Sequence, residues 1–244
     1  MENSFYIQPE LRYGAPVCDE ILIGRYFTIG YSWYFRQAKW TLEIINRNDY
    51  IPTEQERANN FRADIRLPHR FRAGLNAYKG SGYDRGHLVA SANNNVLEIQ
   101  NSETFLLSNM SPQKPNFNRK IWRQLEEAIR TLNVKPEILE TYVLTAPVFY
   151  FDRKIETIGD PNDALGIDIP VPHAFVKSIL AEDRKGELFL WTFKMDNEDL
   201  GGKIEDYMEN TYDMEQLVGG RFWDRISGKD IHKQKETPNK IWNY

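Results

Sequence analysis

The sequence NFNRKIWRQLEEAIRTLN, residues 116–133, contains the clearest helical pattern of the chain. Its apolar residues fall three or four positions apart, so they share one face of a helix over residues 117–132. Asn116, which follows Pro115, is a suitable N-cap for that helix. The apolar face, which is predicted to pack on a core, consists of Ile121, Leu125, Ala128, Ile129 and Leu132.

Strand patterns lie on both sides of this helix. The segment from Ile21 to Trp40 is rich in β-branched and aromatic residues and is predicted to form two strands around Gly30. Strands and helices do not alternate regularly, which favours an α+β fold over a doubly wound sheet. No Gly- or Ser-rich linker divides residues 1–244, so a single domain is predicted. Further strands are predicted at Tyr83–Ala90, Thr104–Asn109, Thr141–Tyr150, His173–Leu180 and Leu188–Lys194, and further helices near 199–208 and 213–218.

The composition excludes several classes of protein and site. Cys18 is the only cysteine, so no disulfide can form within the chain and no cysteine-based zinc site is available. Any metal ion is therefore expected to be a hard cation held by oxygen ligands. No run of about 20 apolar residues is present, which excludes a membrane-spanning helix. Residues 1–14 lack the features of a signal or transit peptide, so we expect a cytoplasmic protein.

The charge distribution, rather than the net charge of −4, indicates a surface for polyanions. Residues 57–85 and 110–135 are strongly basic, whereas residues 181–215 are strongly acidic. A phosphate-binding face needs local positive charge and not a basic protein as a whole. A solvated surface with uneven charge is the alternative interpretation of the same pattern.

The sequence GYDRGH, residues 82–87, contains the candidate catalytic base. The imidazole of His87 has an ordinary pKa of about 6.5, which lets it accept a proton from water at neutral pH. Arg85 can bind a phosphate through two parallel hydrogen bonds. Gly86 lets the backbone pack closely or approach a substrate. A packed or surface histidine is the alternative, and it is the commoner role of an isolated histidine.

Asn118 and Glu126 are the candidate metal-binding residues of the predicted helix. An amide oxygen in the first helical turn can ligate Mg²⁺, which keeps most of its water molecules. Glu126 lies eight residues after Asn118. This separation corresponds to about 80° around an α-helix, so Glu126 is expected to reach a metal-bound water rather than the ion. The alternatives are a capping role for Asn118 and a helical ion pair of Glu126 with Arg123 or Arg130.

Three motifs together resemble the DNA/RNA non-specific endonuclease family, which includes mitochondrial endonuclease G and secreted bacterial sugar-non-specific nucleases. The family pattern is D-R-G-H, then S-N-x-x-P-Q, then N-x-x-x-W-x-x-L-E. These motifs correspond to residues 84–87, 108–113 and 118–126, in the same order and with matching gaps. Weaker matches at residues 59–68, 143–148 and 169–175 extend the resemblance over nearly the whole chain. The last of these runs is expected to lie away from the chemistry, which makes His173 a structural residue.

The resemblance implies an α+β fold with a ββα-metal finger on a central antiparallel sheet flanked by helices. It also implies a metal-dependent endonuclease that hydrolyses DNA and RNA with one Mg²⁺ (or Mn²⁺) per site. His87 would activate water, Asn118 would be the sole direct protein ligand, and Glu126 would hold metal-bound waters. Asn109 would support the site near His87. Phosphate-binding roles are implied for Arg85, Arg119 and one upstream arginine, either Arg57 or Arg62, and structural roles in the first motif for Asp84 and Gly86.

Two other functions use the same residues: a catalytically inactive nucleic-acid-binding protein on a nuclease scaffold, and a small-molecule phosphodiesterase. We expect DNA and RNA as substrates, no membrane association, and a homodimer as the oligomeric state. An unselective nuclease endangers its own cell, so an inhibitor or regulatory protein is also an expected partner. The acidic residues 181–215 could restrain activity by covering the basic face.

Overall fold

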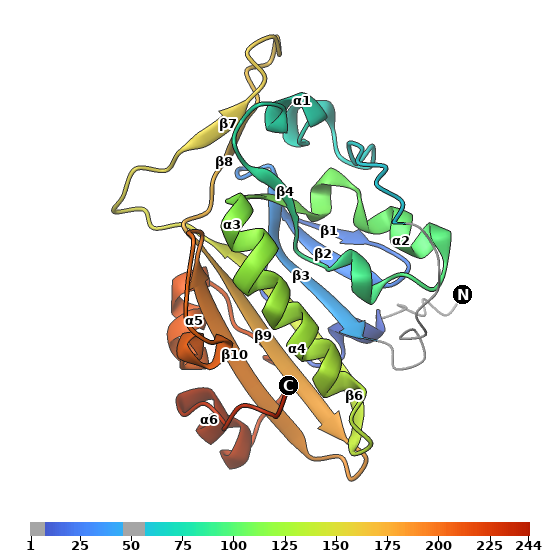
Figure 1. Cartoon of the computed structure of the whole chain (residues 1–244), viewed down its shortest axis with the longest axis vertical. Coiled ribbons are helices and arrows are strands. Elements are labelled where there is room, and N and C mark those ends of the chain that lie inside the picture. The colour runs from blue at the N-terminus through green and yellow to red at the C-terminus, as the bar shows by residue number, and fades with distance from the viewer. Residues whose placement is uncertain (1–7, 46–56) are drawn as a thin grey trace, which may run out of the picture.

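A computed structural model describes residues 8–45 and 57–244. Within these residues, six strands form an antiparallel sheet in the order β1-β2-β3-β6-β9-β10 (Figure 1). The strands are β1 (Glu20–Ile23), β2 (Phe27–Ser32), β3 (Gln37–Ile45), β6 (Ile138–Val148), β9 (Ala174–Asp183) and β10 (Leu188–Asp196). In the described part of the chain, no helix is long and apolar enough to cross a membrane.

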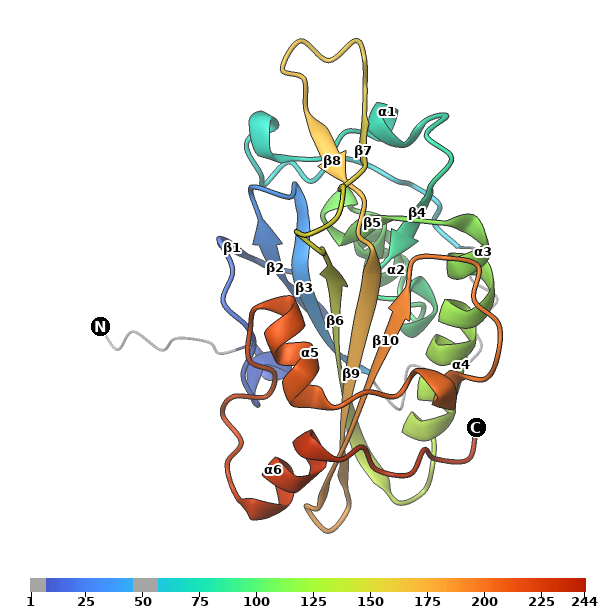
Figure 2. The same ribbon diagram turned by 90° about the vertical axis from the view of Figure 1, so that its left-hand side faces the viewer.

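Both faces of the sheet are buried under helices. Successive side chains of a strand point to opposite faces, so β6 and β9 contribute to two separate cores. Val143 and Ile179 pack in the core beneath α4 (Arg123–Asn133). Leu144 and Leu180 pack in the core on the other face, beneath α5 (Thr211–Val218) and α6 (Lys229–Glu236). Figure 2 shows α4 on one side of the sheet and α5 on the other, an α+β arrangement as the sequence predicts.

A separate hairpin lies beside the α4 side of the sheet. Its strands are β4 (Asp84–His87) and β5 (Met110–Gln113), with Gly86 opposite Ser111. The chain then enters α3 (Pro115–Phe117), a π-helical turn (Asn118–Trp122) and α4 as one continuous helix. This order of two strands and a helix is the finger that the resemblance implies.

The segment between the hairpin strands is mostly helical. It contains two 3₁₀ turns (Ser91–Asn93 and Leu107–Asn109) and α2 (Glu98–Thr104). The predicted strand at Thr104–Asn109 is therefore wrong, because the strand begins only at Met110. Two smaller elements stand beyond the hairpin: α1 (Leu75–Tyr78) and the hairpin of β7 (Thr157–Gly159) with β8 (Asp168–Pro170).

Two local expectations are corrected. Gly30 lies inside β2 and not between two strands. The ring of Trp40 occupies the space in which a side chain at position 30 would lie, and a Cβ on Gly30 would be 2.1 Å from that ring. The turn follows β2, where Arg36 has a positive φ of 54°. Asn116 is not the N-cap, since the helix starts at Pro115 after Lys114, and the Asn116 amide bonds to Asp199 instead.

Candidate active site

The hairpin and the long helix enclose a cavity of about 400 Å³, called here the active-site cavity. His87 from β4, Asn118 from the π-helical turn and Glu126 from α4 all line it. The structure thus brings together three residues that are separated by up to 39 positions in the sequence. The other lining residues are Arg57, Arg85, Ala90, Ser91, Ala92, Arg119, Arg123, Glu127 and Arg130.

His87 is held as a neutral, buried imidazole. Its ring lies 5.7 Å from Phe61 and 4.9 Å from Phe105, centroid to centroid. Burial, together with the positive charges of Arg57 and Arg85, lowers the pKa of His87 to about 3. Its Nε2 atom has no hydrogen-bond partner among the described residues. An imidazole in this state is uncharged at neutral pH and can accept a proton.

Asp84 orients the amide of Asn118. The Asn118 Nδ2 donates a hydrogen bond to Asp84 Oδ2 at 3.0 Å, which leaves the amide oxygen without a hydrogen bond among the described residues. Arg119 donates to both oxygens of the same carboxylate, from Nε at 2.9 Å and from Nη2 at 2.7 Å. Asp84 therefore keeps the Asn118 oxygen free for another ligand, and it neutralises one arginine of the cavity.

The π-helical turn changes the predicted relation between Asn118 and Glu126. A π turn closes i→i+5 hydrogen bonds and so inserts one extra residue into an α-helix. A separation of eight residues then matches a separation of seven in a regular helix, which returns to within about 20° of the same line. The expectation of an 80° offset is wrong, and both side chains line the same cavity.

These donors fit a hydrated hard cation. No group of three or more His, Cys, Asp or Glu side chains that could hold a metal occurs in residues 8–45 and 57–244. The cavity offers one amide oxygen and one carboxylate instead. Mg²⁺ is commonly held by one or two protein oxygens while it keeps several waters, so Asn118 and Glu126 suit it.

The pKa of Glu126 is affected by burial and by the charge of a buried lysine. Burial raises the pKa of the half-buried Glu126 carboxyl, and the positive charges of Lys177 and Arg130 oppose that shift. Lys177, on β9, is 1% exposed. Its Nζ donates to Thr145 Oγ1 at 2.8 Å and lies 4.6 Å from the ring centre of Trp122. Lys177 follows the run at residues 169–175, which the sequence predicts to lie away from the chemistry, and none of these residues lines the active-site cavity.

His173 stands outside the active-site cavity. Its Nδ1 accepts a hydrogen bond from the Tyr150 amide at 3.2 Å, and it lines a different cavity of about 200 Å³. These contacts join β9 to the segment after β6. The structural role expected of His173 fits this position.

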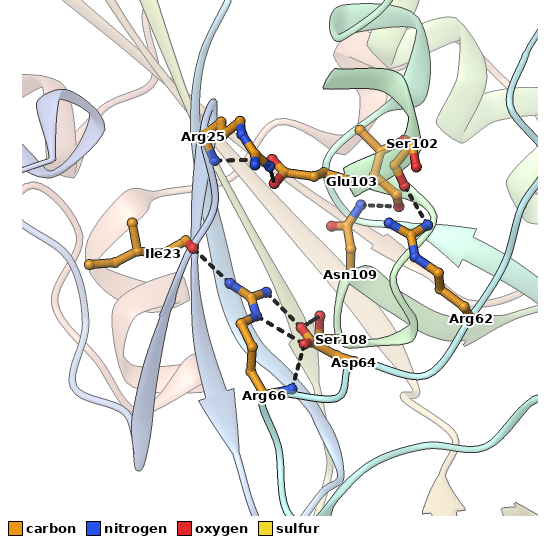
Figure 3. Close-up of polar contacts among 10 residues, drawn as sticks. Ile23, Arg25, Arg62, Asp64, Arg66, Ser102, Glu103, Ser108 and Asn109 are labelled. Atoms are coloured by element: carbon orange, nitrogen blue, oxygen red, sulfur yellow. Dashed lines mark hydrogen bonds and ion pairs between the residues drawn. The ribbon is translucent and has the colours of Figure 1, made fainter. Parts of the chain in front are cut away.

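The candidate phosphate-binding arginines differ in their side-chain contacts and in whether they line the cavity. Arg57 and Arg85 stack over Phe105 and Phe61, with the guanidinium carbon 5.2 Å and 4.1 Å from the ring centres. Arg62 does not line the cavity, because its Nη1 donates to the Ser102 carbonyl at 2.8 Å (Figure 3). Of the two upstream candidates, the structure thus brings only Arg57 to the cavity.

Two lining arginines were not assigned a site role from the sequence. Arg130 lies four residues after Glu126 on α4, and its Nη1 donates to Asn93 Oδ1 at 3.1 Å. Arg123 pairs with Glu127 at 3.5 Å. The i,i+4 spacing of Glu126 and Arg130 indicates in the sequence that both side chains lie on one helix face.

Asn109 is buried and braces the chain after His87. Its Oδ1 accepts from the Val89 amide at 3.0 Å, and its Nδ2 donates to the carbonyls of Val89 and Thr104 at 3.0 and 2.9 Å. It is not among the cavity-lining residues. Figure 3 shows Asn109 next to Ser108, whose hydroxyl donates to Asp64. The S-N motif therefore supports the hairpin from inside the fold.

The acidic segment meets the basic one beside the cavity. Glu198 pairs with Lys114 at 2.6 Å, and Asp199 pairs with Lys120 at 3.0 Å. Neither acidic residue lines the active-site cavity. These pairs hold the loop after β10 against the start of the long helix.

Comparisons with known proteins agree on one family. A model of the DNA/RNA non-specific endonuclease family matches residues 10–228. "Endonuclease G, mitochondrial" of Caenorhabditis elegans is 29% identical, covering 92% of this chain and 74% of that protein. The Homo sapiens protein of the same name is 30% identical over 76% of this chain and 63% of its own length. "Nuclease C1" of Cunninghamella echinulata var. echinulata is 28% identical over 88% of this chain and 88% of its own length. This chain spans less than two thirds of the human protein.

A solved structure is also similar. It is the crystal structure of an EndoG/EndoGI complex, described as showing the mechanism of EndoG inhibition. The match has a TM-score of 0.81 and 28% identity, and it covers 89% of this chain and 91% of that one.

Proposed function

Because the chain belongs to the DNA/RNA non-specific endonuclease family, we propose that it is a metal-dependent endonuclease that hydrolyses phosphodiester bonds in both DNA and RNA. The observation that carries this proposal is that His87, Asn118 and Glu126 line one cavity together with five arginines. A general base, oxygen ligands for a cation and phosphate-binding groups are the parts that phosphodiester hydrolysis needs.

In the proposed mechanism His87 is the general base. Its neutral ring takes a proton from a water molecule as that water attacks the phosphorus atom. The bond from phosphorus to the leaving 3′ oxygen then breaks, and that oxygen takes a proton from solvent. Phe61 and Phe105 fix the ring plane of His87, so the base needs little reorganisation before the reaction.

Asn118 and Glu126 would hold one Mg²⁺ or Mn²⁺ with its water molecules, Asn118 as the direct ligand. When bound, such a cation stabilises negative charge on the phosphate and on the leaving oxygen. Arg57, Arg85 and Arg130 bind the phosphate oxygens. These contacts read the backbone and not the bases, which is why DNA and RNA are both substrates.

The test is cleavage of plasmid DNA and of a long RNA by the purified chain, with Mg²⁺ and with excess EDTA. We expect cleavage of both that EDTA abolishes, and a loss of at least about 10²-fold in His87→Ala. His69→Ala is the matched control, because His69 is an exposed histidine outside the cavity. A parental rate in His87→Ala would reject the base assignment.

The same assay separates the alternative functions. Binding without cleavage would indicate an inactive nucleic-acid-binding protein. Cleavage of a dinucleotide but not of long DNA or RNA would indicate a small-molecule phosphodiesterase.

A homodimer and an inhibitory protein partner are proposed as well. A relative has been solved as the EndoG/EndoGI complex, which supports the second of these. Sedimentation of the purified chain across a range of concentrations tests the first, and a monomer at all of them would reject it.

A further inference from the structure

A second cavity adjoins the active-site cavity along β4, between that strand and α1. It also has a volume of about 400 Å³, and we call it the Lys79 cavity. Arg85 lines both cavities. Asp84, which holds Asn118 and Arg119, lines the Lys79 cavity as well. Figure 1 shows α1 beyond β4, on the side away from α4.

Two polar groups of this cavity lack partners. Lys79 is exposed, and its side-chain ammonium makes no ion pair or hydrogen bond in the described part of the chain. Tyr78 is 5% exposed, and its hydroxyl has no hydrogen-bond partner there either. A buried hydroxyl without a partner loses its hydration and gains nothing in return, which destabilises the free protein. A ligand that accepts a hydrogen bond from Tyr78 would offset this cost.

The rim of the Lys79 cavity leaves room for such a ligand. Gly80 has a positive φ of 72°, and a Cβ placed on it would meet no atom within 4 Å. Leu75, on the other rim, is 41% exposed and presents an apolar surface. A cation, a hydroxyl donor and an apolar surface in one cavity match the phosphate, sugar and base of a nucleotide.

We propose that the Lys79 cavity binds the nucleotide next to the one cleaved, with Lys79 and Arg85 on its phosphate and the Tyr78 hydroxyl donating to its sugar–phosphate backbone. The inference rests on the proposed function, since it extends the path of the same strand. It assigns to Lys79 and Tyr78 a role in holding a polynucleotide, and it makes a strand longer than the reacting dinucleotide the preferred ligand.

The test measures binding, so it does not depend on cleavage. A fluorescently labelled 12-nucleotide single-stranded DNA is titrated with the full chain carrying His87→Ala, in EDTA, and anisotropy gives the Kd. In that background we expect Lys79→Ala to weaken binding about tenfold, the loss of one charge-assisted hydrogen bond. Tyr78→Phe, which keeps the ring, should weaken it about fivefold. The slope of log Kd against log salt should fall by about 0.7 in Lys79→Ala.

Lys233→Ala is the matched control, since Lys233 is an exposed lysine on α6 that lines neither cavity. Lys79→Ala and Tyr78→Phe variants that bind as Lys233→Ala does would overturn the subsite. Binding that depends on Lys79, in a parent chain that cleaves nothing, would support the subsite and reject the endonuclease. Cleavage by the parent, with unchanged binding in Lys79→Ala, would reject the subsite alone.

Discussion

Replacing Asp84 should weaken metal binding without removing any proposed ligand. Asp84 accepts the Asn118 amide at 3.0 Å and so directs the Asn118 oxygen to the cavity. In Asp84→Ala the amide is free to rotate, and its NH₂ group can take the place of the oxygen. Removing a residue that orients a metal ligand typically costs about 10–100-fold in metal affinity, or about 1.4–2.7 kcal/mol.

The assay is direct binding of Mn²⁺, read from the electron paramagnetic resonance signal of the free ion, together with the Mg²⁺ dependence of plasmid cleavage. For Asp84→Ala we expect the Kd for Mn²⁺ and the half-maximal Mg²⁺ concentration to rise together by about 10–100-fold. The cleavage rate at saturating Mg²⁺ should recover most of its value, because His87 keeps its ring contacts with Phe61 and Phe105.

Two further variants separate orientation from charge. Asp84→Asn removes the carboxylate charge but keeps an oxygen that can accept from Asn118, so its affinity for Mn²⁺ should lie closer to the parent. Arg119→Ala removes the two guanidinium contacts and leaves the bond from Asp84 to Asn118, so Mn²⁺ should bind no more weakly than in the parent. An Asp84→Asn variant as weak as Asp84→Ala would refute the orienting role and assign the effect to charge.

Three further predictions concern protonation and packing. The pKa of His87 is lowered to about 3, so the acid limb that His87 itself contributes to kcat/KM should lie below about pH 5. A limb near pH 6.5 that is present in the parent and absent in His87→Ala would contradict the buried neutral base. Burial raises the pKa of Glu43 from 4.5 to about 7, so the folded chain binds the extra proton and stability falls as pH rises through that window. At pH 8, Glu43→Gln should therefore be more stable than the parent by on the order of 3 kcal/mol. Near pH 4.5 the two proteins should be equally stable. Urea unfolding at both pH values tests this. Gly86→Ala should lower the free energy of unfolding by about 1–3 kcal/mol in the same assay, because the new Cβ would lie 2.0 Å from Gln113 Oε1. Gly74→Ala is the control and should leave stability nearly unchanged, because a Cβ there would meet no atom within 4 Å.

The regular elements of the fold were largely predictable because their periodicity is strong. The helix expected over residues 117–132 runs from Pro115 to Asn133, and the strands expected after it appear as β6, β9 and β10 with shifted ends. The α2 helix was missed because its sequence, EIQNSET, is mostly polar and lacks an apolar period. Gly30 was misplaced for a different reason, since the neighbour that requires a glycine there is Trp40 on the adjacent strand.

The site could be predicted as far as local motifs reach. His87 and Asn118 follow from short strings, and their meeting in one cavity follows from the hairpin and helix that the resemblance implies. The sequence could not decide whether Arg57 or Arg62 lies at the cavity. Arg62 is kept away from the cavity by its hydrogen bond to the carbonyl of Ser102, which belongs to another element. The positive charge of Lys177 acts on Glu126 from β9, and the register of that strand in the sheet determines its position, so nothing near Glu126 in the sequence indicates it.

The π-helical turn is what joins the local motifs into one site. With Asn118 and Glu126 eight residues apart, a regular α-helix would turn the carboxylate about 80° away from the amide, whereas one inserted residue brings both to the same line. Arg130 follows Glu126 by four residues and extends that line, since i,i+4 side chains are neighbours on a helix. The amide of Asn118, the carboxylate of Glu126 and the guanidinium of Arg130, which we propose to serve the cation, its waters and the phosphate, then form one row that lines the cavity with His87. With a seven-residue spacing the two side chains would reach the same alignment in an unbroken helix, and the π turn provides that alignment at the eight-residue spacing of this sequence.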